Sequence, residues 1–281
     1  MWQTSYDGSP TLYLIPTPIG NLDDVTFRTI KVLKAVEVVF SEDTRVTLNL
    51  LNYLQISKKL IALHDHNEDK LKEKVLEYLE NGYSVGLVTD RGTPIISDPG
   101  YKSVKYVAGK GFNVVSLPGA CAFVPALVVS GITSQHFLFY GFLNSKDVAK
   151  KKELESLKYC RYTLIFYEAP HRILKTMTMI LEVFGDRFVS LSREISKKYE
   201  SVYRGMISDL LPTLQSIKGE FVVVVSGYAG EDEDVVNLSI IDAVNMYINR
   251  GIEKKDAIKL VAKEKKISKS EVYHEYHLGG K

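Results

Sequence analysis

Three short apolar runs of the chain each end in a loop that contains glycine, and this repetition limits the fold. The runs and the loops that follow them are Leu12–Pro16 with Thr17–Asn21, Val85–Val88 with Thr89–Gly100, and Val114–Leu117 with Pro118–Ala120. Apolar runs this short, bounded by glycine and proline, are typical of buried parallel strands. Loops after such strands line the edge at which α/β proteins bind ligands, and glycine lets the main chain approach a ligand closely. The pattern predicts a crevice built from backbone, which suits a polar, nucleoside-sized ligand better than a metal ion.

The composition excludes several classes of protein. The 281 residues carry 36 basic and 34 acidic side chains, so the net charge of +2 gives no overall signal for nucleic-acid binding. The two cysteines, Cys121 and Cys160, cannot form a disulfide framework or a cysteine-rich zinc site, and a cytoplasmic location is expected. No run approaches the roughly 18 apolar residues of a membrane helix. Residues 1–10 lack the apolar core of a signal peptide, and we expect a flexible tail there.

Strands and helices alternate over residues 11–119, which predicts an N-terminal α/β domain with a mostly parallel sheet. The expected strands are Leu12–Pro16, Val36–Phe40, Leu60–Leu63, Val85–Val88 and Phe112–Leu117. The expected helices are Thr26–Ala35, Thr44–Leu54, Leu71–Leu79 and Tyr101–Ala108. Asn67 is a candidate N-cap for the third of these helices.

Closely spaced strands over residues 120–229 predict a second, α+β domain with an antiparallel or mixed sheet. The expected strands are Phe137–Phe142, Leu164–Tyr167, Phe188–Arg193, Ser201–Met206 and Phe221–Ser226. A helix is expected at Ile173–Phe184, and the boundary between the two domains is expected between Pro118 and Gln135.

A small helical module is expected over residues 230–281, after an acidic linker at Glu231–Asp234. Its expected helices are Ile240–Ile248, Lys254–Ala262 and Ser268–Tyr276. Ser268 and Glu271 have the spacing of a capping box, in which each side chain bonds the other's backbone N–H.

Basic residues gather in this module. From Arg250 to Lys269 there are eight Lys/Arg and three Asp/Glu, a local charge of 8 − 3 = +5. Lys255, Lys259 and Lys263 recur at every fourth position and fall on one helix face. Such a face is either simply solvated or contacts the phosphates of a nucleic acid.

Polar residues follow the second expected strand in Ser41–Arg45. These acids can stabilise a helix N-terminus. Alternatively, Glu42 or Asp43 accepts a proton in the crevice, and Arg45 binds a phosphate. The acids also lie about twenty residues after Gly20, where dinucleotide-binding folds place a ribose-binding acid. The Gly20 loop itself has neither the P-loop nor the GxGxxG pattern.

Two further polar motifs follow strands. The His-x-His of His64–Glu68 is a spacing found in some metal sites, but a catalytic or substrate-binding role of His66 is the stronger interpretation. The alternative is a helix cap by Asn67 with solvated imidazoles. In Tyr167–Arg172, Glu168 and Arg172 can form a structural ion pair, or the Ala169-Pro170 turn can hold Tyr167 or Glu168 against a bound purine. Basic residues interleaved with tyrosine in Arg193–Glu200 are compatible with RNA contact.

Taken together, these motifs resemble the small-subunit ribosomal RNA cytidine 2′-O-methyltransferases of the tetrapyrrole methylase superfamily. The matching strings occur in the expected order between Leu12 and Gly227. They are TPIGNL (Thr17–Leu22), SEDTR (Ser41–Arg45), HDHNE (His64–Glu68), GTPIISDPG (Gly92–Gly100), SLPG (Ser116–Gly119), FYEAPHR (Phe166–Arg172) and SREISKKYES (Ser192–Ser201).

The resemblance implies two α/β domains with S-adenosylmethionine in the cleft between them, a small helical module at the end, and a homodimer. It assigns cofactor binding to the glycine-bearing loops and to the strand that ends at Tyr167. The implied cofactor-binding residues are Asp90, Gly92, Thr93, Pro94, Ile95, Asp98, Gly100, Leu117, Pro118, Gly119, Ala120, Cys121, Tyr167 and Glu168. The chain departs from the family pattern at Arg91, which replaces a small residue, and at Ala120–Cys121, which replaces Pro-Ser.

The resemblance also implies methylation of a ribose 2′-hydroxyl in small-subunit ribosomal RNA or the assembled subunit. The candidates for the proton acceptor are Glu42, Asp43 and His66. The candidates for contact with RNA are Asn21, Arg45, His64, Asn67, Glu68, Arg172, Arg193, Lys197, Lys255, Lys259 and Lys263. No metal is expected.

Three other functions fit parts of the sequence. A methyltransferase acting on a small tetrapyrrole would share the cofactor loops but would not need the basic module. A metal-dependent hydrolase would use His64 and His66. A non-catalytic RNA-binding protein would lack cofactor binding altogether.

Overall fold

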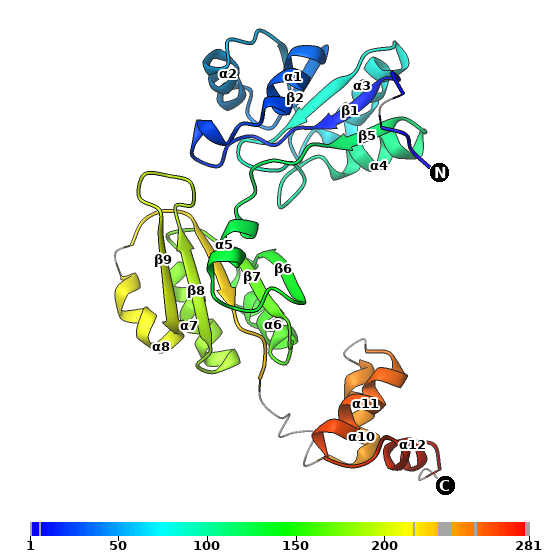
Figure 1. The fold of residues 1–281 in the computed structure, drawn as a ribbon, viewed down its shortest axis with the longest axis vertical. Helices are drawn as coiled ribbons and strands as arrows, with labels where there is room; N and C mark the ends of the chain where they lie inside the picture. Colours follow the sequence, from blue (N-terminus) through cyan, green and yellow to red (C-terminus); the bar gives the residue numbers. More distant parts are fainter. Residues whose placement is uncertain (1, 6, 216, 230–237, 250–251, 279–281) are drawn as a thin grey trace. The chain divides into compact units, whose positions relative to one another are not determined.

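The structure, a computed structural model, describes residues 2–5, 7–215, 217–229, 238–249 and 252–278 (Figure 1). The chain forms two units, one made of Met1–Glu155 and Tyr162–Ser226 and the other of Ser156–Arg161 and Gly227–Lys281. Among the helices described, none is both long and apolar enough to cross a membrane.

The first sheet of the larger unit was predicted to be mostly parallel and is fully parallel, with the strand order β3-β2-β4-β1-β5. Its strands are β1 (Thr11–Leu14), β2 (Val38–Ser41), β3 (Lys59–Ala62), β4 (Val85–Val88) and β5 (Asn113–Ser116). Its helices are α1 (Phe27–Ala35), α2 (Thr44–Tyr53), α3 (Glu68–Glu80) and α4 (Tyr101–Gly109), with a short 3-10 helix η1 (Leu22–Asp24) after β1. Each predicted element of this part is present, with ends shifted by a few residues.

Two separate cores flank this sheet because successive strand residues point to opposite faces. Val38 and Phe40 pack with Val75 of α3, whereas Val39 packs with Leu33 of α1 on the other side. The sheet is therefore buried on both faces between two layers of helices (Figure 1). This explains why its strands appear in the sequence as continuous apolar runs.

The segment before β1, where we expected a flexible tail, is hydrogen-bonded to β5. The Gln3 amide donates to the Val114 carbonyl at 2.9 Å and accepts from the Val114 N–H at 3.0 Å. The Asn113 amide donates to the Thr4 carbonyl at 3.1 Å. These bonds satisfy backbone groups on the edge strand of the sheet.

The second sheet is mixed, with the strand order β6-β7-β10-β8-β9. Its strands are β6 (Phe137–Phe142), β7 (Thr163–Glu168), β8 (Phe188–Arg193), β9 (Ser201–Met206) and β10 (Phe221–Val225). Only β6 and β7 pair in parallel, and the other neighbours are antiparallel. The helices of this part are α5 (Phe123–Val129), α6 (Asp147–Leu157), α7 (Ile173–Phe184), α8 (Ile207–Leu210) and the 3-10 helix η2 (Leu211–Leu214).

Helices α5 and α6 were not expected from the sequence. Helix α5 contains Pro125 and otherwise resembles a strand in composition, although it packs Leu127 against Ile165 of β7. Helix α6 is rich in charge and buries only Lys150 and Leu154, so it has no apolar periodicity to detect.

The smaller unit is a bundle of α10 (Ile240–Asn249), α11 (Lys254–Glu264) and α12 (Lys269–Leu278), close to the three predicted helices. The capping box is confirmed, since the Ser268 N–H donates to Glu271 at 2.9 Å and the Glu271 N–H donates to the Ser268 hydroxyl at 3.1 Å. The expected acidic linker at 231–234 and the basic residue at 250 lie outside the described residues.

Candidate functional site

The three glycine-bearing loops lie together at the carboxyl edge of the parallel sheet. Thr17 and Gly92 exchange backbone hydrogen bonds of 2.9 and 3.0 Å. The Thr93 hydroxyl donates to the Ala120 carbonyl at 3.0 Å. The loop after β4 is therefore tied to both of the other loops, as expected for a crevice at the ends of β1, β4 and β5.

The long loop after β4 has unusual backbone geometry. Gly92 and Gly100 have φ angles of +87° and +123°, and Ile95 and Ser97 also have positive φ, at 77° and 67°. A positive φ costs a β-branched residue such as Ile95 of order 1–3 kcal/mol, which the surrounding packing must offset. Strain of this kind is concentrated at binding and catalytic sites.

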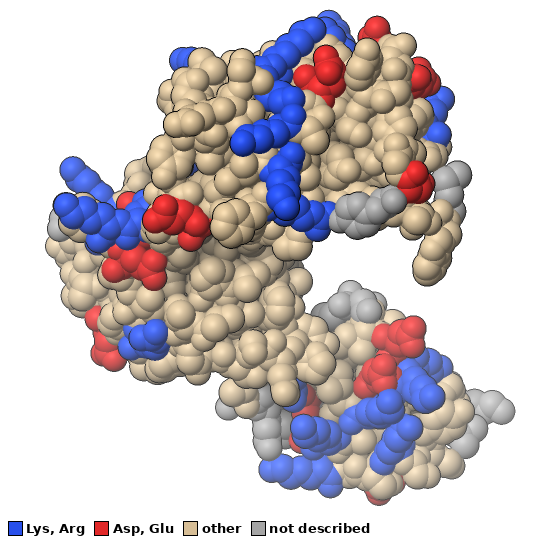
Figure 2. Space-filling model, turned by 45° about the horizontal axis from the view of Figure 1, so that its top comes forward, with Lys and Arg blue, Asp and Glu red and all other residues tan. Residues whose placement is uncertain are grey.

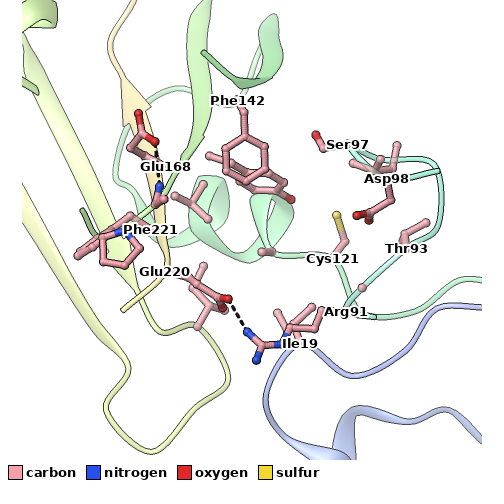
Figure 3. Close-up of a pocket in the computed structure, with 18 residues that line it drawn as sticks. Ile19, Arg91, Thr93, Ser97, Asp98, Cys121, Phe142, Glu168, Glu220 and Phe221 are labelled. Carbon is pink, nitrogen blue, oxygen red and sulfur yellow. Dashed lines mark hydrogen bonds and ion pairs between the residues drawn. The ribbon is translucent and has the colours of Figure 1, made fainter. Parts of the chain in front are cut away.

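A cavity of about 380 Å³ opens between this loop and the ends of β6, β7 and β10 (Figure 3). Six of the residues expected to bind cofactor line it: Gly92, Thr93, Asp98, Cys121, Tyr167 and Glu168. Ile19, Phe142 and Phe221 add apolar surface. The size lies within the range of small-molecule sites.

The other residues expected to bind cofactor do not line this cavity. They are Asp90, Pro94, Ile95, Gly100, Leu117, Pro118, Gly119 and Ala120. Several of them shape the loops instead: the Leu117 side chain is buried in the core, and a Cβ on Gly119 would lie 2.6 Å from Cβ of Pro16. Gly119 thus allows two of the loops to touch.

Several lining residues were missed in the sequence because they come from strands of the second sheet. Phe142 ends β6 and Phe221 begins β10. Strand β10 runs antiparallel to β7, which brings its start beside the end of β7. The signal available was an aromatic residue at each strand end, but its use required the strand order.

Carboxylates cluster near the cavity and alter one another's protonation. Burial raises the pKa of Asp98 to about 6, and the nearby charge of Glu42 adds to this effect. Burial also raises the pKa of Asp90, with a further contribution from Glu42. Burial raises the pKa of the Tyr167 hydroxyl as well. The cavity is thus a poorly solvated site that favours a cationic ligand.

The Ser41–Arg45 segment lies next to the long loop. The Glu42 carboxylate accepts a 2.7 Å hydrogen bond from the Thr89 hydroxyl, and the Asp43 N–H donates to Asp90 at 3.0 Å. Asp43 also pairs with Arg45 at 2.6 Å, and hydrogen bonds from Arg45 lower its pKa to about 2. Asp43 is therefore a weak base, and Glu42 is engaged in holding the loop.

The His64–Glu68 segment divides into structural and exposed residues. Glu68 is buried and accepts from the Ser103 N–H at 2.8 Å in the first turn of α4. Asn67 occupies the N-cap position of α3, but its side chain accepts from the His64 N–H at 2.9 Å and makes no cap hydrogen bond to that helix. His66 is exposed. Among the described residues there is no group of three or more metal-ligating side chains.

A second groove, of about 430 Å³, lies beside the cavity and is lined by Thr17, Asp90, Arg91 and Lys197 among others. Arg91, which lines both spaces, forms an ion pair with Glu220 (Figure 3). Lys197 pairs with the same carboxylate at 2.6 Å. The Arg91–Glu220 pair joins the long loop of the first sheet to the second sheet.

The remaining candidates for RNA contact lie in several places. Asn21 caps η1 by accepting from the Asp23 N–H at 3.1 Å, and Arg193 donates to the Lys218 carbonyl. Arg172 pairs with Glu168 at 3.0 Å, the structural alternative considered for this motif.

The candidate lysines of the smaller unit, Lys255, Lys259 and Lys263, are exposed on one face of α11. Figure 2 shows basic side chains gathered on this unit. Lys259 also pairs with Asp256 at 2.7 Å, an exposed contact that water weakens.

Comparison with known proteins assigns the family. The model of the "Tetrapyrrole (Corrin/Porphyrin) Methylases" family matches residues 11–211, which include both sheets up to β9 and every loop of the cavity from the first sheet. The chain belongs to the tetrapyrrole methylase family. A family relative from Bacillus subtilis (strain 168), "Ribosomal RNA small subunit methyltransferase I", is 44% identical over 286 residues, covering 98% of each chain.

Solved structures share the family fold at low sequence identity. Uroporphyrin-III C-methyltransferase from Thermus thermophilus, complexed with S-adenyl homocysteine, has a TM-score of 0.54 and 15% identity, covering 77% of this chain and 97% of that one. Diphthine synthase has a TM-score of 0.59 and 12% identity, covering 77% and 90%. Two such different names on one fold show that the fold alone does not determine the substrate.

Proposed function

We propose that this chain transfers a methyl group from S-adenosylmethionine to the ribose 2′-hydroxyl of a cytidine in small-subunit ribosomal RNA. The observation that carries the proposal is the cavity beside the long loop after β4, which is hydrogen-bonded to the other two glycine-bearing loops. Its family membership and a full-length relative named for ribosomal RNA methylation support the same reaction.

The residues of the cavity fit this cofactor. Gly92 provides close backbone approach, since a Cβ there would lie 3.3 Å from Ile19 and 3.6 Å from the Ala120 carbonyl oxygen. Tyr167 and Phe142, with ring centroids 5.5 Å apart, offer apolar surface for an adenine ring. The Asp98 carboxylate lies in the same space and attracts positive charge (Figure 3).

When bound, S-adenosylmethionine supplies an electrophilic methyl group on a positively charged sulfur. The chain's own task is to align the ribose oxygen with that methyl group, because positioning alone contributes several kcal/mol in such reactions. A ribose hydroxyl is a poor nucleophile, so a proton acceptor assists. We assign that role to His66, since Asp43 is held as a weak base by Arg45 and Glu42 holds Thr89. The loop that carries His66 lies close to the cavity, as the neighbouring residue shows: the charge of Asp65 contributes to the raised pKa of Asp98.

We propose that the RNA approaches along the second groove and the 41–45 and 64–68 segments, with the lysines of α11 contacting phosphates elsewhere on the RNA. The three lysines are exposed, and each phosphate contact releases a counterion from RNA.

A homodimer is also part of the proposal. Val124 and Val128, one turn apart on α5, are 47% and 74% exposed, and Phe137, whose ring centroid lies 6.3 Å from that of Phe123 at the start of α5, is 43% exposed. Exposed apolar side chains that lie together are typical of a protein interface. A ribosomal substrate further requires a cytoplasmic location. Sedimentation of the purified chain tests the dimer.

The test of the function is direct. The purified chain is incubated with S-adenosylmethionine bearing a labelled methyl group and with small ribosomal subunits or their RNA, and nuclease digests are analysed by mass spectrometry. The expected product is one 2′-O-methylated cytidine. Methylation of a base, or of an added tetrapyrrole instead of RNA, would refute the proposal.

The RNA-binding role of α11 has its own test. Replacement of Lys255, Lys259 and Lys263 by glutamine should weaken RNA binding. It should also reduce the slope of log affinity against log salt concentration by about 2 in magnitude. Cofactor affinity should not change and serves as the internal control. An unchanged salt slope would show that these lysines do not contact RNA.

A further inference from the structure

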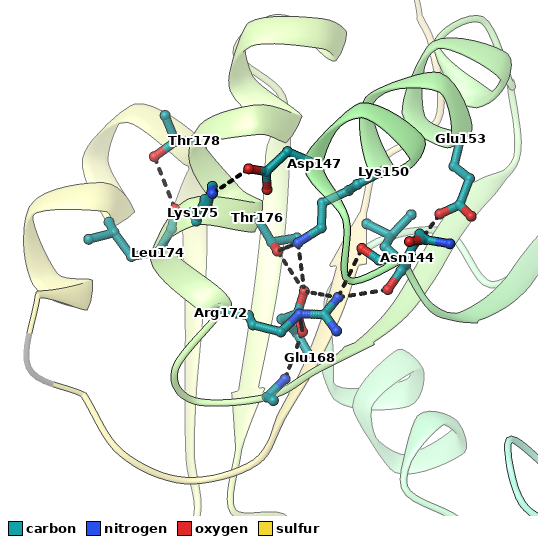
Figure 4. Close-up of polar contacts among 12 residues, drawn as sticks. Asn144, Asp147, Lys150, Glu153, Glu168, Arg172, Leu174, Lys175, Thr176 and Thr178 are labelled. Atoms are coloured by element: carbon teal, nitrogen blue, oxygen red, sulfur yellow. Dashed lines mark hydrogen bonds and ion pairs between the residues drawn. The ribbon is translucent and has the colours of Figure 1, made fainter.

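A buried charged cluster (Figure 4) is centred on Glu168, which also lines the cavity, and the proposed reaction does not use it. Its centre is the carboxylate of Glu168, whose side chain is fully buried. Lys150 of α6 is also buried, with 2% of its side chain exposed, and Thr176 of α7 is fully buried. Arg172, at the start of α7, completes the cluster.

The contacts of this cluster form a connected network. The Lys150 ammonium donates to the Thr176 hydroxyl at 2.6 Å, and that hydroxyl donates to Oε2 of Glu168 at 2.5 Å. Lys150 Nζ itself lies 3.6 Å from Oε2. On the other side, Arg172 Nε lies 3.0 Å from Oε1 of Glu168. The Thr176 hydroxyl thus bridges the Lys150 ammonium and the Glu168 carboxylate through two short hydrogen bonds.

This arrangement is energetically expensive. Removing an ammonium group from water carries a penalty of several kcal/mol, and an apolar replacement of similar volume is often as stable. Burial lowers the pKa of Lys150 accordingly. Stability alone is therefore a weak reason for a lysine at this position.

The network ends on the two segments that form the cavity wall. Oε1 of Glu168 accepts the Ala169 N–H at 2.9 Å, which fixes the turn after Tyr167. The Arg172 guanidinium donates to the Leu143 carbonyl at 2.6 Å, next to Phe142. Since the Glu168 carboxylate is occupied by these partners, it does not serve as a ligand in the cavity.

We propose that Lys150 and Thr176 are positioning residues that, through Glu168, hold the Phe142 and Tyr167 walls in the geometry that binds the cofactor. The inference rests on the proposed function, because it needs S-adenosylmethionine to bind between these walls. It also reassigns Glu168 from a cofactor contact to a support of the turn.

The experiment compares Thr176→Val with Thr176→Ser in the full chain, by calorimetric titration with S-adenosylmethionine and by steady-state kinetics. Valine matches the shape of threonine but lacks the hydroxyl that bridges Lys150 and Glu168, whereas serine keeps this hydroxyl. Thr176→Val should weaken cofactor binding about tenfold and raise the KM for cofactor similarly, with kcat at saturation nearly unchanged. Thr176→Ser should bind within twofold of the unaltered chain. A tenfold change corresponds to about 1.4 kcal/mol, the scale of a hydrogen bond to a charged group.

A matched control lies on the same pair of helices. Lys175 of α7 pairs with Asp147 of α6 at 2.5 Å, but both side chains are at least half exposed. Lys175→Ala removes a contact between the same helices without reaching Glu168, so its cofactor affinity should stay within twofold. Near-ultraviolet circular dichroism checks that each variant is folded.

A second variant covers the case in which Thr176→Val does not fold. The double replacement Lys150→Met with Thr176→Val leaves apolar groups in place of the ammonium and hydroxyl, and it should fold and show the same loss of affinity. Folded Thr176→Val or double variants that bind like the unaltered chain would overturn the inference. An equal loss in Lys175→Ala would also overturn it. If the unaltered chain fails to bind S-adenosylmethionine, the proposed function itself is wrong.

Discussion

Replacing Gly92 by alanine should separate the contribution of backbone strain to stability from its contribution to cofactor binding. Gly92 has a φ of +87°, and Gly82, in the turn after α3, has the same φ of +87°. Alanine in this left-handed region costs about 1–2 kcal/mol at either position. Gly82→Ala is therefore a matched control for strain.

The two sites differ in what the new methyl group meets. At Gly82 nothing lies within 4 Å, whereas at Gly92 the Cβ would lie 3.3 Å from Cγ2 of Ile19. The backbone of Gly92 also donates one hydrogen bond to Thr17 and accepts one from it. Relief of strain and crowding at Gly92 therefore requires the loop to leave the position that borders the cavity.

We expect both variants to lose about 1–2 kcal/mol of unfolding free energy in urea titrations, with Gly92→Ala losing somewhat more because of the close contact. Calorimetric titration with S-adenosylmethionine should show unchanged affinity for Gly82→Ala and at least about tenfold weaker binding for Gly92→Ala. Gly92→Val, with a branched side chain, should block binding. Unchanged affinity in a folded Gly92→Ala protein would refute the assignment of this loop to the cofactor.

Three further outcomes follow from named contacts. Because a bound cation favours the ionised form of Asp98, whose pKa is about 6, cofactor affinity should fall as the pH drops below 6, and Asp98→Asn should remove that dependence in calorimetry between pH 5 and 8. Arg45→Ala should raise the pKa of Asp43 from about 2 toward its ordinary value. In the unaltered chain the Asp43–Arg45 pair stabilises the fold above pH 4 and is lost as the pH falls toward 2, and the variant should lack this pH-dependent contribution. A carbon-detected NMR titration in which the pKa of Asp43 in the variant remains about 2 would contradict the role of Arg45. Tyr247→Phe removes a 2.6 Å hydrogen bond to the buried Glu264 and should destabilise the helical unit by about 1.5–3 kcal/mol in thermal unfolding, whereas an unchanged melting curve would show that the bond contributes nothing.

The first sheet was predictable because its pattern is local. The central strands β2 and β4 are buried along their whole length, so their apolar runs are continuous, and glycine or a capping residue marks the ends of the elements. Thr26, for example, accepts from the Thr29 N–H at 3.0 Å at the start of α1. The helices α5 and α6 escaped prediction because proline and a charged surface obscure their periodicity.

Part of the site was predictable for the same reason. The long loop was expected to line the crevice, and Gly92, Thr93 and Asp98, to which the family resemblance assigned cofactor binding, do line the cavity. Phe142 and Phe221 were not predicted, because they reach the cavity only through the order of strands in the second sheet.

The sequence by itself determined the alternation of strands and helices, the glycine-bearing loops and the edge of the sheet at which they meet, since these depend on local backbone preferences and on apolar periodicity. Only the tertiary structure decided that the Glu168 carboxylate pairs with Lys150, and that Glu68 supports α4. The physical reason is that the role of a carboxylate depends on its partners, and those partners lie 18 and 35 residues away in the chain.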